Sequence, residues 1–232
     1  MLLKEEEREL LVAGLQHLGI WRRVTESLPS EQYNGSHWMI DRFSLFLEEL
    51  LLWNRKTNLI GRATVRDIII RHVLDSLSVY HLLKEKNSSI LDVGASAGFP
   101  SVPLAIVDGA LRITAVERRQ KRAAFLRNIA LLLRLDNLDV READVRDIGC
   151  GFDIALARGV GELAFLVKLT RHILKEQGMI IAFKGKITEI EKEVSRLKEK
   201  TVGGKGRNLS IQRVKIPFLD EEERNIVIIE TK

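Results

Sequence analysis

The chain has 232 residues, of which 45% are hydrophobic and 30% charged, and its formal net charge is +5. This is the composition of a globular protein, and Cys150, the only cysteine, rules out a disulfide framework within the chain. The N-terminus is acidic and no apolar run approaches the roughly 20 residues of a membrane span, so we expect a cytoplasmic protein with no membrane partner.

The first third of the chain has the hydrophobic spacing of helices. One helix is predicted over about 5–18 and another over about 64–83. Between them, a helix beginning near residue 36 carries one apolar stripe, made of Met39, Phe43, Phe46, Leu50 and Trp53. Residues 1–83 are therefore expected to form a helical extension that packs on the core.

From residue 84 to 232 the pattern changes to short apolar strands that alternate with helices. Strands are predicted at 89–93, 112–116, 138–141, 153–157, 179–183, 211–216 and 225–230. Helices are predicted up to 107, up to about 135, and over 162–175 and 188–200, followed by a loop with Gly203, Gly204 and Gly206. This order predicts a doubly wound, mostly parallel, seven-stranded α/β sheet of Rossmann-like type, with the last two strands as an antiparallel hairpin.

A glycine-rich turn follows the first predicted strand, in the sequence Asp92-Val93-Gly94-Ala95-Ser96-Ala97-Gly98-Phe99-Pro100. Ligands of open α/β sheets bind at such strand ends. The dinucleotide fingerprint would need glycine at positions 96 and 99, where Ser96 and Phe99 stand. Because Asp92 would also bring a negative charge near a pyrophosphate, a nicotinamide cofactor is disfavoured.

The turn suits S-adenosylmethionine, which has a cationic end and no phosphate. Asp92 can receive its ammonium directly or through water, and Gly94 and Gly98 allow the backbone to approach closely. Glu117 ends the second predicted strand, where a carboxylate can accept both ribose hydroxyls, and Asp144 follows the third, where it can accept the adenine amino group. Each carboxylate alone could be merely solvated, but three at successive strand ends favour one binding site.

Two clusters of basic residues favour a polyanionic partner. One lies at the start of a helix and contains Arg118, Arg119, Lys121, Arg122 and Arg127. Residues 184–215 contain 10 basic and 4 acidic side chains. Either cluster alone could be a solvated face, whereas two clusters that flank one site indicate nucleic acid.

The chain resembles the RsmG/GidB family, bacterial methyltransferases that modify N7 of a guanosine in 16S ribosomal RNA. The resemblance covers nearly the whole chain, and Arg-His-x-x-Asp-Ser together with Gly-Phe-Pro is its most specific part. It depends on Trp53-Asn54 with Asn58-Leu59, Arg71-His72-x-Leu74-Asp75-Ser76-Leu77, Leu91-Asp92-Val93-Gly94, Gly98-Phe99-Pro100 with Pro103-Leu104-Ala105-Ile106, Lys121-Arg122 with Phe125-Leu126, Phe152-Asp153, Arg158 and Lys184-Gly185.

The resemblance implies a class I methyltransferase fold, S-adenosylmethionine as cofactor and 16S ribosomal RNA or the small ribosomal subunit as partner, with the protein acting as a monomer. The expected cofactor site comprises Asp92, Gly94, Ser96, Gly98, Phe99, Glu117, Ala143, Asp144 and Arg158. Arg158 and Lys184 are the expected catalytic residues, with no metal, and RNA contacts are expected from Arg71, His72, Arg118, Lys121 and Arg122. For Arg158 the alternative is a salt bridge with a nearby acid, for His72 a structural hydrogen bond, and for Phe99 packing in the core, which is favoured.

The chain departs from the family at Ser96 and Ser101, where glycine is usual, and at Ala157-Arg158-Gly159, where Ser-Arg-Ala is common. A serine at 96 fits the turn if its φ angle is negative. Two alternatives therefore stay open: a methyltransferase with another RNA or small-molecule acceptor, and an RNA-binding homologue whose catalysis is impaired.

Overall fold

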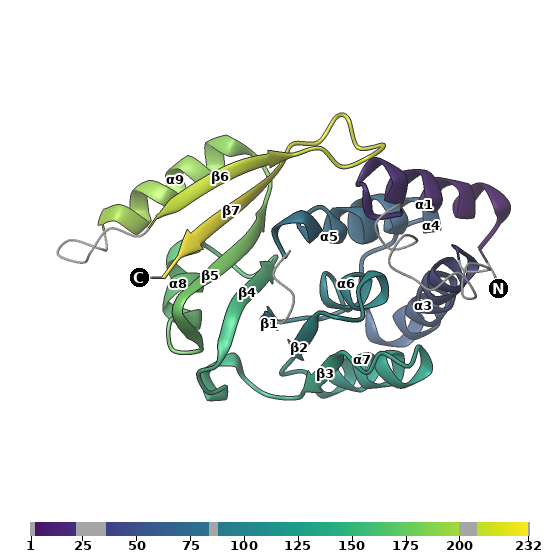
Figure 1. The fold of residues 1–232 in the computed structure, drawn as a ribbon, viewed down its shortest axis with the longest axis horizontal. Helices are drawn as coiled ribbons and strands as arrows, with labels where there is room; N and C mark the ends of the chain where they lie inside the picture. The colour runs from purple at the N-terminus through teal and green to yellow at the C-terminus, as the bar shows by residue number, and fades with distance from the viewer. Residues whose placement is uncertain (1–2, 22–35, 84–87, 200–207, 232) are drawn as a thin grey trace.

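The computed structural model describes residues 3–21, 36–83, 88–199 and 208–231. Within these ranges, seven strands form one sheet in the order β3-β2-β1-β4-β5-β7-β6 (Figure 1). The strands are β1 (Ser89–Val93), β2 (Arg112–Val116), β3 (Leu138–Arg141), β4 (Phe152–Arg158), β5 (Leu174–Lys184), β6 (Leu209–Val214) and β7 (Arg224–Glu230). β7 is antiparallel to β5 and β6, and the other neighbours are parallel, which confirms the predicted fold class.

Helices cover both faces of the sheet, because successive side chains of a buried parallel strand point to opposite layers. In β1, Ile90 belongs to one hydrophobic cluster, whereas Leu91 and Val93 belong to the other. The first cluster includes α6 (Ser101–Val107) and α7 (Gln120–Leu132), and the second includes α8 (Leu163–Thr170) and α9 (Ile187–Glu199). Figure 1 shows these two pairs on opposite sides of the sheet.

The N-terminal helices share the core of the α6–α7 layer. They are α1 (Glu5–His17) and α3 (Ser36–Thr57). In the predicted α3 stripe, Met39, Phe43, Phe46 and Leu50 are buried, whereas Trp53 is half-buried. The Phe46 ring lies 5.4 Å from the ring of Phe99 and 6.5 Å from that of Phe125, so aromatic contacts join α3 to the turn after β1 and to α7.

The segment 64–83 is helical as predicted, but it is not one continuous α-helix. The segment consists of α4 (Val65–Ile68), a π-helical turn η2 (Ile69–Leu74), α5 (Asp75–Leu77) and a 3₁₀ turn η3 (Tyr80–Leu82). Hydrophobic periodicity does not report a π-turn, which inserts one residue without breaking the buried face. The turn contains Arg71 and His72, and Asp75 follows it.

The prediction of a helix over 162–175 is wrong at its end. α8 stops at Thr170, and β5 begins at Leu174, before the predicted start of that strand. The backbone N–H groups of Gly151 and Phe152 donate to the Ile173 carbonyl, so pairing with β4 overrides the helical preference of the Leu-Lys-Glu-Gln segment. The other predicted elements agree with the structure to within a few residues, and the predicted Gly203–Gly206 loop lies outside the described residues. In the described ranges, no helix is long and apolar enough to span a bilayer.

Candidate functional site

A cavity of about 470 Å³ opens where β1, β2 and β3 end. Its wall contains Gly94, Glu117, Ala143 and Asp144, so the structure brings together four of the predicted cofactor residues. They meet because β1, β2 and β3 are parallel neighbours whose carboxyl ends share one edge of the sheet. Val160, Phe165 and Leu169 form an apolar wall of the same cavity.

Glu117 is a buried carboxylate, only 5% exposed, with two backbone donors. The N–H of Ser96 donates to Oε2 over 3.1 Å, and the N–H of Arg119 donates to Oε1 over 2.8 Å. A carboxylate has about four acceptor positions, so two remain for hydroxyl groups of a ligand in the cavity. The two backbone bonds also fix the carboxylate in place before any ligand arrives.

Asp144 has an ion-pair partner on its own turn. Arg146 Nη2 lies 2.7 Å from Asp144 Oδ2, and the side-chain hydrogen bond from Arg146 holds the pKa of this carboxyl well below its usual range. Asp144 is thus a permanently ionised acceptor at the rim of the cavity. Arg118 and Arg122 line the same wall.

The turn after β1 is built from residues in the left-handed region. The φ angles of Gly94, Ser96 and Gly98 are +69°, +51° and +87°. At Gly98 an added Cβ would lie 2.6 Å from Val102, so this position requires glycine. Ser96 therefore does not have the negative φ that would make a serine comfortable there, and its hydroxyl accepts a hydrogen bond from Arg122 Nη1 at 2.8 Å.

Ser96→Gly should relieve backbone strain and raise the free energy of unfolding by about 0.5–1 kcal/mol. The gain is smaller than the full strain because the bond to Arg122 is lost. The matched control is Ser210→Gly on exposed β6, where the φ angle is ordinary and the change should destabilise the protein. Thermal unfolding of both variants checks this, and a lower midpoint for Ser96→Gly would show that the serine is unstrained.

Asp92 lies beneath this turn and does not line the cavity. It is 1% exposed, and the backbone N–H of Ser101 donates to its Oδ2 over 3.2 Å. Burial raises the pKa of Asp92 to about 6. The Ser101 hydroxyl is buried and has no hydrogen-bond partner among the described residues.

Asp92→Asn should stabilise the fold at neutral pH. The pKa of Asp92 in the fold is about 6 against an ordinary 3.8, so the folded state holds the proton more tightly and loses stability as pH rises through this window. The variant should exceed wild type by about 2–3 kcal/mol at pH 7, and the difference should vanish below about pH 4. Denaturant unfolding from pH 3 to 8 measures this difference in the free energy of unfolding, and Asp139→Asn, at an exposed position, is the control. A difference that does not change with pH would refute a buried charge on Asp92.

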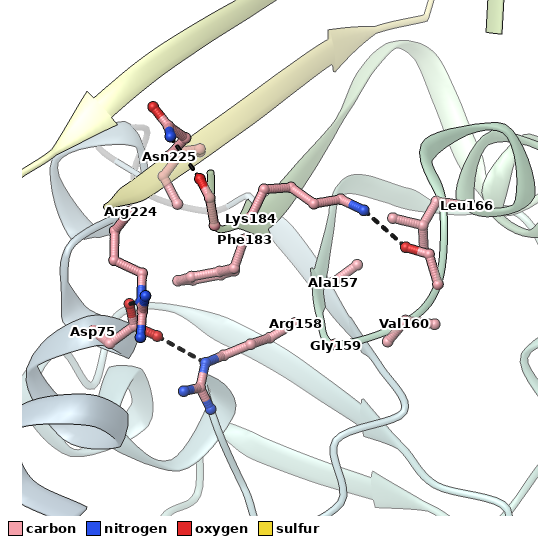
Figure 2. A pocket seen from close by; sticks show the side chains of 13 residues that line it. Asp75, Ala157, Arg158, Gly159, Val160, Leu166, Phe183, Lys184, Arg224 and Asn225 are labelled. Carbon is pink, nitrogen blue, oxygen red and sulfur yellow. Dashed lines mark hydrogen bonds and ion pairs between the residues drawn. The ribbon is translucent and has the colours of Figure 1, made fainter. Parts of the chain in front are cut away.

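A second cavity of about 370 Å³ lies beside the first, between the ends of β4, β5 and the start of β7. Figure 2 shows Arg158, Lys184 and Arg224 around it, and Val160 lines both cavities. The Lys184 ammonium donates to the Gly161 carbonyl over 2.8 Å and lies 2.7 Å from Glu193 Oε2 on α9. Lys184 is thus a neutralised cation that fixes the glycine-rich loop after β4.

Arg158 is clamped to the N-terminal helices. Its Nε donates to Asp75 Oδ2 over 2.8 Å (Figure 2). Nη1 donates to His72 Nδ1 over 3.1 Å, and Nη2 donates to the Arg71 carbonyl over 2.7 Å. Three of its five N–H groups therefore have protein partners. Asp75 is almost fully buried, and Arg224 approaches its other oxygen at 3.5 Å. The salt bridge considered as the alternative for Arg158 is present, and two N–H groups remain for a ligand.

The structure separates the residues that were predicted to contact RNA. Arg71 forms an ion pair with Glu222, and Lys121 is exposed away from both cavities. His72 stacks on Phe99 at 5.0 Å, and burial lowers the pKa of His72 to about 4, so the imidazole is neutral and accepts from Arg158. Phe99 lies between His72 and Phe46 and lines neither cavity, which matches the packing interpretation.

Several cavity residues had no signal in the sequence. Arg224 and Asn225 reach the second cavity because β7 pairs with β5, which strand order along the chain does not reveal. Glu193 was one charge among many on a charged helix. Phe165 had a usable signal, because it falls outside the helical stripe that contains Leu163 and Leu166. In the structure its ring is 54% exposed and lines the first cavity.

Comparison with known proteins gives one consistent result. A family model described as GidB, rRNA small subunit methyltransferase G, matches residues 39–227. Proteins named ribosomal RNA small subunit methyltransferase G are 32% identical in Acetivibrio thermocellus, over 96% of this chain and 87% of theirs, and 32% identical in Oceanobacillus iheyensis, over 90% of both.

Solved structures agree at the level of the fold. An O-methyltransferase from Bacillus cereus in complex with SAH superposes with a TM-score of 0.54 at 15% identity, over 81% of this chain and 91% of that one. A ribosomal protein L11 methylase from Lactobacillus delbrueckii superposes with a TM-score of 0.55 at 15% identity, over 75% and 82%. At these identities the two structures do not indicate the substrate of this chain, and they establish its fold alone.

Proposed function

Because the chain belongs to the GidB family, rRNA small subunit methyltransferase G, we propose that it transfers a methyl group from S-adenosylmethionine to N7 of a guanosine in the 16S RNA of the small ribosomal subunit. The family makes it a methyltransferase that depends on S-adenosylmethionine. The relatives match over most of the chain, and they favour neither of the two alternatives, which are another methyl acceptor and an RNA-binding role without catalysis.

The observation that carries the proposal is the set of groups around the first cavity. Glu117 has two acceptor positions left for the ribose hydroxyls, and Asp144 is an ionised acceptor for the adenine amino group. Phe165 and Leu169 offer an apolar wall for the adenine ring. Asp92 lies beneath the turn and outside the cavity, so it would attract the ammonium group through its charge and without direct contact. When bound, S-adenosylmethionine supplies the methyl group from its sulfonium.

The second cavity is the proposed place of the acceptor base, because Val160 lies between it and the first cavity. N7 of a neutral guanine has a free lone pair, so no side chain has to remove a proton. Guanine gains positive charge as it accepts the methyl group, and a bare cation beside N7 would oppose this. The pairing of Lys184 with Glu193 and of Arg158 with Asp75 reduces that opposition. The chain then acts by holding the base in line with the methyl donor.

The substrate has to present its base outside a regular helix, because the N7 edge of paired RNA lies in a deep, narrow groove. The target guanosine is therefore in a loop or is extruded into the second cavity. A substrate in the small ribosomal subunit places the reaction in the cytoplasm, and a monomer suffices because one chain builds both cavities.

Transfer of labelled methyl from S-adenosylmethionine to small subunits that lack the modification tests the proposal. Nucleoside analysis should recover the label as 7-methylguanosine. Label in another nucleoside would refute the assigned atom, and no transfer by a protein that binds the cofactor in calorimetry would refute the acceptor. Absence of both transfer and binding would refute the reaction itself.

A further inference from the structure

A third cavity, of about 480 Å³, lies apart from the two already described. It is a groove between the end of α1, the segment Leu77–His81 and strand β6, and Figure 1 shows the β6–β7 connection reaching over α1 beside it. The ring of Phe218 in that connection lies 5.7 Å from the ring of His17. The polar side chains of the groove are those of His17, Ser78, Tyr80, His81, Gln212, Arg213 and Lys215.

The groove is basic. Arg213 lies on β6 and Lys215 directly follows its end, and both are exposed and line the groove. Neither forms an ion pair with any residue that the structure describes. The wall has no carboxylate in the described part of the chain, and Asp220 and Glu221 belong to the connection beyond it. Such a groove attracts anions.

Two histidines add ring nitrogens of defined orientation. His17 Nδ1 lies 2.7 Å from the Ala13 carbonyl, and His81 Nδ1 lies 2.9 Å from the Ser78 carbonyl. A carbonyl only accepts, so Nδ1 of each ring carries the proton and Nε2 is the nitrogen left for a ligand. In the cationic form of the ring Nε2 is a donor, which suits a phosphate, and in the neutral form it is an acceptor, which suits a ribose 2′-hydroxyl. The described residues contain no group of three or more potential metal ligands, so the pair is not part of a metal centre of that kind.

Paired residues of β6 and β7 connect the groove to the proposed acceptor cavity. Arg213 pairs with Asn225 and Val214 pairs with Arg224 across β6 and β7, and both partners line the second cavity. One helical segment also joins the two sites, since Asp75 lines the second cavity and His81 lines the groove. The six steps from Asp75 to His81, through α5 and the 3₁₀ turn η3, span about 9–12 Å, which corresponds to about three nucleotides of a stacked strand.

We propose that this groove is a second RNA site, which binds backbone phosphates of the strand that flanks the target guanosine. The inference rests on the proposed function for the identity of the strand, and on Arg213, Lys215, His17 and His81 for its chemistry. Phosphate contacts of this kind position a nucleic acid without reading its sequence. The groove thus supplies affinity for the subunit, whereas the second cavity holds the reacting base.

The test compares Arg213→Ala/Lys215→Ala with Lys168→Ala/Arg171→Ala. The control removes the same two charges from exposed positions at the end of α8 that line none of the three cavities. Methyl transfer to unmodified small subunits should show a KM raised about tenfold in the groove variant, with kcat within about twofold. Binding of a short fluorescein-labelled RNA should lose between one and two units of the slope of log K against log salt. Arg213→Lys/Lys215→Arg should restore both values.

Cations on an edge strand also deter pairing between chains, but that role would leave the salt slope unchanged. If the groove variant keeps the KM and the salt slope of an active wild-type protein, the groove does not bind RNA. The proposed function would be unaffected by that result. Equal losses in the two variants would also overturn the groove as an RNA site, because net charge alone would then explain them. If wild type fails to transfer methyl but the groove variant alone loses RNA affinity, the groove stands and the proposed reaction falls.

Discussion

Arg158→Ala is expected to reduce methyl transfer by about 100-fold and the free energy of unfolding by about 3 kcal/mol. The reason is that Arg158 connects the end of β4 to the helical segment 71–75 through three hydrogen bonds. Its loss leaves the buried carboxylate of Asp75 with Arg224 alone, at 3.5 Å. Cofactor affinity should be unchanged, because Arg158 does not line the first cavity.

Unfolding midpoints, calorimetry with S-adenosylmethionine and transfer kinetics measure the three effects separately. Arg141→Ala is the control, because it breaks an Arg–Asp pair whose side chains are 50% and 57% exposed and should change stability by less than about 1 kcal/mol. The double variant Asp75→Asn/Arg158→Ala removes the unpaired carboxylate and should regain stability without regaining transfer. Wild-type transfer in the single variant would refute the role of Arg158, and recovery of transfer in the double variant would reduce that role to folding.

Local sequence was enough to predict four residues of the first cavity, whereas the other five predicted cofactor residues, Asp92, Ser96, Gly98, Phe99 and Arg158, do not line it. Gly94, Glu117, Ala143 and Asp144 each follow a strand end, and parallel strands place their ends at one edge whatever else the chain does. The sheet was predictable for the same reason, since short apolar runs alternate with amphipathic helices. The sequence also indicated that Ser96 could be strained, because glycine is usual there in the family. Only the folded turn shows the positive φ angle that causes the strain.

The second cavity depends on contacts between residues far apart in the chain. Arg158 meets Asp75 across 83 positions, and Lys184 meets Glu193 only because α9 folds back over β5. The sequence does not show which acidic residue pairs with a given basic residue. Arg158 and Lys184 were therefore predicted as catalytic residues without the carboxylates that neutralise them. The π-turn at Ile69–Leu74 was invisible for a related reason: it changes the direction in which Arg71 and His72 point while it keeps the same buried face.

Glu117→Ala is expected to weaken S-adenosylmethionine binding by between about 100-fold and 10,000-fold. Two hydrogen bonds from ribose hydroxyls to a charged, buried acceptor are worth about 1.5–3 kcal/mol each. The substitution also releases the backbone N–H groups of Ser96 and Arg119, which the carboxylate now holds, so the turn above the cavity loses its anchor. Calorimetry measures the affinity directly, without any need for an RNA acceptor.

Glu142→Ala is the matched control, because Glu142 stands at the neighbouring strand end, pairs with exposed Arg127 and does not line the cavity. Glu117→Gln separates charge from shape: it keeps one acceptor oxygen but replaces the other with a donor that faces the N–H of Ser96 or Arg119. Its affinity should therefore lie close to that of Glu117→Ala rather than wild type. A Gln variant that binds as tightly as wild type would mean that the ribose is not held by Glu117. The proposed position of the cofactor would then be wrong, and Asp144 and Asp92 would be the remaining carboxylates that could bind it.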